Sequence, residues 1–271
     1  MLTRPRPIGA VSVLIVVFIL RLPLPEKHDL PLIEKLKNLD PLGNLFFAPS
    51  IISLLLALQW GGIDYPWDSA RVIALLVLFV VLFAAFIAVQ VFKQDTATIP
   101  PRIFIQRTIA SGACYCMCVG GIMLAFGYYL AIWFQAIQGV NALESGIRSL
   151  PFILSLVVAS IFAGMFITNL GYYTPLVILS ACLMAIGAGL LTTLRVNSGK
   201  PMWFGFQVIA GFGMGLGMQQ PSLAAQVVLA ADDVAIGASL MFFAQSFGGA
   251  IFVCAAQNVF VNKLEIGRAH V

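Results

Sequence analysis

Carboxylates are the side chains of this sequence best suited to chemistry, and they avoid its long apolar runs. All 11 acidic residues lie in polar connections or near the ends of those runs. Asp64, Asp68, Asp232 and Asp233 could act at a membrane interface, but we expect them to be solvated loop charges, the last two alternatively serving as a helix N-cap. Because the runs contain no carboxylate pair, proton relay or nucleophile–base arrangement, the sequence predicts no enzyme activity and no cofactor.

Cysteines alternate within one apolar run, at Cys114, Cys116 and Cys118, while Cys182 and Cys254 lie in two other runs. A metal site on this C-x-C-x-C motif is one interpretation. However, positions i, i+2 and i+4 do not share one face of a helix, and no histidine is nearby. We therefore expect buried free thiols that act as small hydrophobic residues, and no metal ion.

Neutral polar and aromatic side chains are what the apolar runs offer for binding. They either bond between helices and anchor the chain at the interface, or line a cavity for an amphipathic organic solute. Both interpretations are open. The residues concerned are Gln59, Tyr128, Tyr129, Trp133, Gln135, Gln207, Gln219, Gln220, Gln245, Gln257 and Asn258.

Glycine recurs at helical spacing inside one apolar run. Gly211, Gly213, Gly215 and Gly217 form two overlapping G-x-x-x-G pairs. No strand precedes them and no lysine follows, so a phosphate-binding loop is disfavoured and close helix–helix packing in lipid is the better interpretation. The pairs Gly120–Gly121 and Gly248–Gly249 belong to the same class.

The amino-acid composition indicates that these apolar runs lie in lipid rather than in water. Hydrophobic residues make up 61% of the 271 positions and charged residues only 10%, whereas a soluble domain carries about 25% charged residues. The sequence therefore predicts an all-α, polytopic transmembrane bundle of about eight spans whose partners include membrane lipids. Each span needs about 20 apolar residues. Seven segments qualify, at 42–62, 72–92, 109–135, 150–167, 173–194, 203–220 and 236–260, and a short eighth lies at 8–20. The net charge of +4 is too small and dispersed to indicate nucleic acid.

Polar connections between these segments indicate sidedness. Residues 23–40 show helical spacing of leucines and isoleucines among charges, which predicts an amphipathic helix on the membrane surface. Residues 23–40 and 93–107 fall on one face, which we take as cytoplasmic from a weak excess of basic residues, and 63–71 falls on the opposite face.

Several longer sequence segments resemble those of the major facilitator superfamily, in particular of the fourteen-span drug:proton antiporters of filamentous fungi. That group includes mycotoxin and multidrug efflux pumps. The resemblance runs from Pro7 to about Leu264. Its phrases are LQWGGIDYPW at 58–67, ATIPPRIF at 97–104, YYLAIWFQAIQG at 128–139, LESGIR at 143–148, GFGMGLGMQQP at 211–221 and GASLMFFAQSFGGA at 237–250.

The resemblance implies a carboxy-terminal fragment of a multi-pass efflux pump, with five parts. These are a truncated amino-terminal bundle (1–22), a cytoplasmic amphipathic linker (23–41), two linker spans with a loop (42–107), a carboxy-terminal bundle lacking its last span (108–264) and a tail (265–271). A degenerate copy of the family's cytoplasmic signature stands at 164–173, where Thr168, Asn169, Tyr172 and Tyr173 replace charged residues. The tail is polar and lacks helical periodicity, which predicts a non-native ending.

The resemblance also implies a function. Small amphipathic organic compounds would leave the cell through the plasma membrane in exchange for protons, by rocking of two helical halves about a central site. It makes Tyr128, Tyr129, Gln135, Gln207 and Gln245 candidate cavity residues. The alternative is a polytopic structural membrane protein without transport activity.

Overall fold

The computed structural model describes residues 40–94, 97–196 and 198–269. The predicted short span at 8–20 and the amphipathic helix at 23–39 lie outside the described residues. The described part is helical throughout and forms one compact unit from Leu42 onward. Its helices are α3 (Pro41–Trp60), α4 (Ala70–Lys93), α5 (Pro101–Phe104), α6 (Arg107–Ala136), α7 (Ala142–Arg148), α8 (Leu150–Leu170), α9 (Thr174–Thr192), α10 (Lys200–Gly217), α11 (Gln220–Val228) and α12 (Val234–Ala269). The predicted all-α class is confirmed.

Every one of the seven apolar segments lies on a helix, but their outlines need correction. The segment predicted at 203–220 ends at Gly217 and is followed by a separate helix, α11, because Pro221 cannot continue the ladder. The short helices α5 and α7 were not predicted. Helix α12 runs on through Ala269 and so includes most of the segment that was expected to form a tail.

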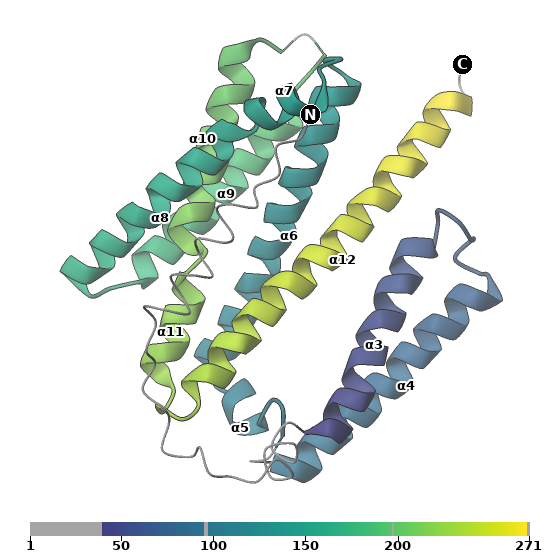
Figure 1. Cartoon of the computed structure of the whole chain (residues 1–271), viewed down its shortest axis with the longest axis vertical. Coiled ribbons are helices and arrows are strands. Elements are labelled where there is room, and N and C mark those ends of the chain that lie inside the picture. The colour runs from purple at the N-terminus through teal and green to yellow at the C-terminus, as the bar shows by residue number, and fades with distance from the viewer. Residues whose placement is uncertain (1–39, 95–96, 197, 270–271) are drawn as a thin grey trace, which may run out of the picture. The chain divides into compact units, whose positions relative to one another are not determined.

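Within the described residues, six helices are long and apolar enough to cross a membrane, namely α3, α4, α6, α8 together with α7, α9 and α12. The predicted seventh, α10, is not among them. Its glycines, Lys200 and Gln207 dilute its apolar character. However, α10 packs against both α8 and α9 (Figure 1). A helix surrounded by protein needs less apolar surface than one that faces lipid, so its span remains a prediction.

Apolar side chains cover the outer faces of the helices, which confirms an integral membrane protein. A soluble monomer rarely exposes such a continuous apolar surface. On α4 and α8 the exposed apolar residues include Ile73, Val77, Leu78, Val80, Val81, Ile87, Val91, Ile153, Leu154, Val157, Val158, Ile161 and Phe162.

Helix α10 contacts two neighbours through its interleaved glycines. A Cβ added at Gly211 or Gly215 would strike the backbone of α8, whereas one added at Gly213 or Gly217 would strike α9. The hydroxyl of Ser180 on α9 donates a hydrogen bond of 2.6 Å to the Gly213 carbonyl. Each G-x-x-x-G pair therefore lies against a different helix.

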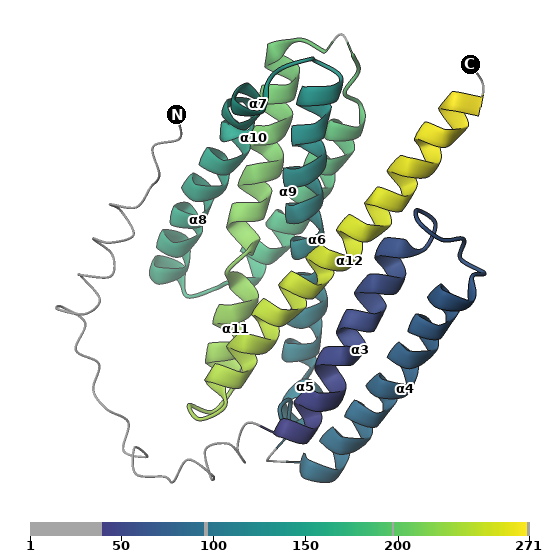
Figure 2. The same ribbon diagram turned by 45° about the vertical axis from the view of Figure 1, so that its right-hand side comes forward.

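Helices α6 and α12 run side by side in both views (Figure 1 and Figure 2). A Cβ at Gly120 of α6 would collide with the backbone of Gln245, and one at Gly248 of α12 would collide with the backbone of Met117. The two backbones thus approach each other at two levels, and at each level one of the two helices has a glycine.

We predict that Gly213→Leu destabilises the bundle. A Cβ there would lie 2.7 Å from the Leu183 Cβ and 2.8 Å from the Met184 nitrogen, so a larger side chain must separate α9 from α10. Overpacking of this kind costs about 1–3 kcal/mol or more. Thermal melting in detergent measures the loss. The matched control is Gly205→Leu on the same helix, where an added Cβ meets no described atom within 4 Å. Equal melting temperatures for the two variants would contradict the packing argument.

Topology supplies a second prediction, which also decides whether α10 crosses the membrane. Asp64 lies in the turn between α3 and α4, and Asp232 lies between α11 and α12. If α4, α6, α8, α9 and α10 all cross, the two turns lie on opposite sides. Asp64→Cys and Asp232→Cys in a cysteine-free background should therefore react with a membrane-impermeant thiol reagent from opposite sides. Labelling from one side would remove α10 from the set of spans.

Candidate functional site

Five predicted cavity residues are distributed over three helices. Tyr128, Tyr129 and Gln135 lie on α6, Gln207 on α10 and Gln245 on α12. Only the two tyrosines are brought together, with ring centroids 5.3 Å apart. None of the five lines the pockets described below, so their role as a cavity lining remains a hypothesis.

Tyr128 and Tyr129 face different surroundings. Tyr128 is 52% exposed, and Gln135, two turns further along the same face of α6, is also exposed. Tyr129 instead turns toward α12, where its hydroxyl donates a hydrogen bond of 3.5 Å to the Val253 carbonyl. Its ring also lies 6.0 Å from that of Phe260. Tyr129 therefore joins two helices, while Tyr128 and Gln135 face outward.

The Gln207 side chain is fully buried in the bundle. One turn before it, Trp203 packs edge-on against Phe134 of α6 at 5.2 Å. One turn after it, Ala210 belongs to a cluster with Val119. Among the described residues, neither the oxygen nor the nitrogen of the Gln207 amide has a hydrogen-bond partner. An orphaned amide of this kind costs about 1–3 kcal/mol, so Gln207 pays a stability penalty at this position.

The break between α10 and α11 creates the second polar feature. Met218 and Gln219 form a turn, and Pro221 has no amide hydrogen to donate to the Gly217 carbonyl. The break leaves carbonyls at the end of α10 without helical donors. The Gln220 side chain serves one of them, because its amide nitrogen donates a hydrogen bond of 2.8 Å to the Leu216 carbonyl. Its amide oxygen is buried without a partner among the described residues.

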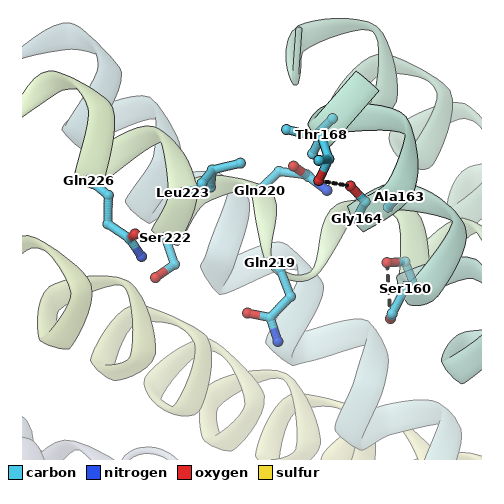
Figure 3. Close-up of a pocket in the computed structure, with 11 residues that line it drawn as sticks. Ser160, Ala163, Gly164, Thr168, Gln219, Gln220, Ser222, Leu223 and Gln226 are labelled. Carbon is cyan, nitrogen blue, oxygen red and sulfur yellow. Dashed lines mark hydrogen bonds between the residues drawn. The ribbon is translucent and has the colours of Figure 1, made fainter. Parts of the chain in front are cut away.

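A pocket of about 350 Å³ opens beside this break, between α8 and the α10–α11 junction (Figure 3). Ser160, Gly164 and Thr168 follow one another at four-residue spacing along α8. Figure 3 shows Ser222 and Gln226 on the opposite side, on α11. The side chains that line this pocket are neutral, as suits an uncharged or amphipathic ligand.

Sequence reasoning identified only part of this pocket. Gln219 and Gln220 were recognised as neutral polar groups, and Thr168 as part of the degenerate signature, but Ser160, Ser222 and Gln226 were missed. The available signal was the spacing i, i+3, i+7 of Gln219, Ser222 and Gln226, which places all three on one helix face.

An ion pair links the segment before α6 to the start of α12. The guanidinium of Arg102 donates to both carboxylate oxygens of Asp233, at 2.6 and 2.9 Å. The Asp233 side chain is only 10% exposed, so its interpretation as a solvated loop charge is wrong. The bidentate pair with Arg102 replaces the water that a loop carboxylate would bind. Asp64, Asp68 and Asp232 are exposed, as expected for loop charges.

Cysteines occupy both sides of α6. Cys116 is buried, whereas Cys114 and Cys118, and Cys182 on α9, are exposed. The expectation that all the thiols are buried is therefore wrong, because positions i, i+2 and i+4 of a helix point in different directions and do not all meet a neighbouring helix. No group of three or more His, Cys, Asp or Glu side chains able to hold a metal ion occurs within the described residues.

We predict opposite effects from two glutamine substitutions on α10 and α11. Gln207→Met removes an orphaned amide and should raise the melting temperature in detergent, since the free energy of unfolding gains up to about 1–3 kcal/mol. Gln220→Met removes the donor to the Leu216 carbonyl and should lower it. The two variants serve as controls for each other. Destabilisation by Gln207→Met would show that its amide has a partner in the membrane, such as a bound water molecule.

Comparison with known proteins places these features in a context. No family model matches the chain. It is 49% identical over 262 residues to the MFS-type efflux pump MFS1 of Trichophyton rubrum, covering 96% of this chain and 49% of the relative. The MFS-type transporter VdtG of Byssochlamys spectabilis is 48% identical over 95% of the chain and 46% of its own length. The rubrofusarin-specific efflux pump aurT of Gibberella zeae is 44% identical over 95% and 47%.

These relatives are named as transporters and pumps, not as enzymes. The chain spans about half the length of the curated relatives it matches.

Proposed function

Because the chain belongs to the major facilitator superfamily, in which the efflux pump MFS1 of Trichophyton rubrum shares 49% of the aligned residues, we propose that it serves the export of small amphipathic organic compounds across the plasma membrane. In this proposal its helices supply part of the substrate-binding surface. The relatives support the class of activity, and the neutral lining of the pocket beside α11 supports the class of substrate.

The observation that carries the proposal is the neutral pocket at the break between α10 and α11. Broken helices at membrane depth are tolerated where they line a cavity, and transporters build substrate sites from them. Here Gln219 and Gln226 remain exposed beside the pocket, and the buried Gln220 repairs only one of the freed backbone groups. Amides and hydroxyls orient a ligand without demanding a particular charge.

Proton antiport is the mode of coupling that we propose. Among the described residues, carboxylates occur only in connections, in the short helix α7 and near the far end of α12. An intramembrane carboxylate is the usual proton relay. Coupling would therefore need carboxylates supplied from beyond these helices, and the chain by itself should bind substrate without pumping it.

The structural alternative has its own support. Tyr129 lies in the contact between α6 and α12, and its hydroxyl joins the two helices through the hydrogen bond to the Val253 carbonyl. A protein that used all its polar groups in this way would need no ligand. The two interpretations differ in what the exposed amides of α11 do.

We predict that the purified chain binds rhodamine 6G, a fluorescent amphipathic cation, and that Gln219→Ala and Gln226→Ala each weaken binding roughly fivefold, the effect of losing about one hydrogen bond. Fluorescence polarisation in detergent measures the affinity. Tyr128→Ala and Gln135→Ala test the outward face of α6 in the same assay. The matched control is Gln257→Ala on α12.

Reconstitution separates binding from pumping. Liposomes that contain only this chain should show no dye export when a proton gradient is imposed. Unchanged affinity in all four variants, relative to Gln257→Ala, would favour the structural alternative. Gradient-driven export by this chain alone would contradict the proposed source of the coupling carboxylates.

A further inference from the structure

A second cavity lies on the other side of the described unit, between the hairpin of α3 and α4 and the pair formed by α6 and α12. Its volume is about 840 Å³, and it presents only apolar surface. This volume lies within the range of about 300–1,000 Å³ typical of ligand sites. Gln90 is the one polar residue in its wall, and its side-chain oxygen is occupied by a hydrogen bond of 2.9 Å from the Ile99 amide.

Phenylalanine rings form much of the wall. They join in a continuous chain from α4 through α3 to α12, with successive centroids 4.6–6.1 Å apart. The chain consists of Phe79, Phe83, Phe86, Phe47, Phe243 and Phe247. These rings, together with a hydrogen bond of 3.0 Å from the Asn258 amide of α12 to the Leu58 carbonyl, hold α3 beside its neighbours without close backbone contact, so space remains between the helices.

Such a space has a preferred occupant. Water does not fill a cavity that offers it no polar partners, and an empty cavity deprives its wall of dispersion contacts. The cavity lies between membrane-spanning helices, so the molecule at hand is a lipid. A hydrocarbon chain supplies the missing contacts and requires no hydrogen bond.

Basic residues continue the lining at one end. On α6 the lining positions Ala110, Cys114 and Met117 share a face, and Arg107 precedes them by one turn on that same face. On α4 the last lining positions are Gln90 and Val91, and Lys93 follows Gln90 by about one turn. Both cations adjoin the connection between α4 and α6, and Arg107 is exposed.

An apolar cavity with cations at its mouth matches an amphiphile that has a hydrocarbon tail and an anionic head. Basic pockets between transmembrane helices bind the headgroups of anionic lipids. Arg102, in the same connection, already forms a bidentate pair with Asp233. We propose that this cavity binds one anionic membrane phospholipid, with an acyl chain among the phenylalanines and its phosphate at Arg107. This proposal stands apart from the pocket beside α11.

Lipid retention tests the proposal directly. The full chain is incorporated into nanodiscs of equal parts phosphatidylserine and phosphatidylcholine, transferred to mild detergent, and analysed by native mass spectrometry for bound lipid. We expect one retained phosphatidylserine in preference to phosphatidylcholine. Arg107→Glu should lower retained phosphatidylserine roughly fivefold or more, because each basic residue contributes substantially to headgroup binding. The control is Arg195→Glu, an exposed arginine in the connection between α9 and α10.

Filling the cavity tests the tail. Ala110→Trp should reduce retention of both lipids, whereas Ile178→Trp, at a position of α9 that is 61% exposed, should not. If Ala110→Trp fails to fold, Cys114→Phe fills the same wall from an exposed position. Equal retention in the filled and control variants overturns the site. Loss of lipid on filling, but no effect of Arg107→Glu or no preference for phosphatidylserine, overturns the anionic headgroup.

Discussion

Helix association in hydrocarbon is the constraint on which the rest of this structure depends. Lipid tails are as apolar as the helix surfaces, so burial alone gives the helices no reason to associate. Close approach replaces that driving force. On α10 the alternating glycines let α8 and α9 reach the backbone from two sides, and Gly120 and Gly248 do the same between α6 and α12.

Close approach also makes backbone carbonyls available to neighbouring hydroxyls. The Ser180 hydroxyl reaches the Gly213 carbonyl at 2.6 Å, and the Ser160 hydroxyl reaches the Gly215 carbonyl at 3.2 Å. Neither bond would form if a side chain kept the helices apart. Ser160 also lines the pocket beside α11, so the packing that holds α8 against α10 also positions a wall of the candidate site.

The existence of the long helices could be predicted because charge is absent from them, and that signal needs no knowledge of the neighbours. Their faces could not be predicted in the same way. Helix α8 carries apolar side chains on every side, so its sequence does not indicate which side meets α10 and which meets lipid. The cysteines of α6 show the same limit, since position alone did not reveal that Cys116 is buried while Cys114 is exposed.

Candidate site residues were only partly predictable for a related reason. Gln207 and Gln220 are both neutral amides in one apolar run, yet one is orphaned and the other repairs a carbonyl. The difference arises from the break between α10 and α11, which leaves the Leu216 carbonyl within reach of the Gln220 amide nitrogen. The partner of Asp233 was harder still to predict, because Arg102 is 131 residues away and only the tertiary fold brings the two together.

That ion pair shows how the chain uses its few charges. Breaking a buried pair by removing one partner is costly, while the pair itself contributes little net stability. With Arg102 54% exposed and Asp233 10% exposed at the side chain, the bond is better explained by positioning. It joins the segment before α6 to the start of α12, the two helices that run side by side along the apolar cavity. Asp233 neutralises the charge of Arg102, whereas Arg107, one turn before the first lining residue of α6, is a cation suited to a lipid phosphate. The arginine of the ion pair and the arginine at the cavity mouth therefore lie within five residues of each other, where α4 connects to α6.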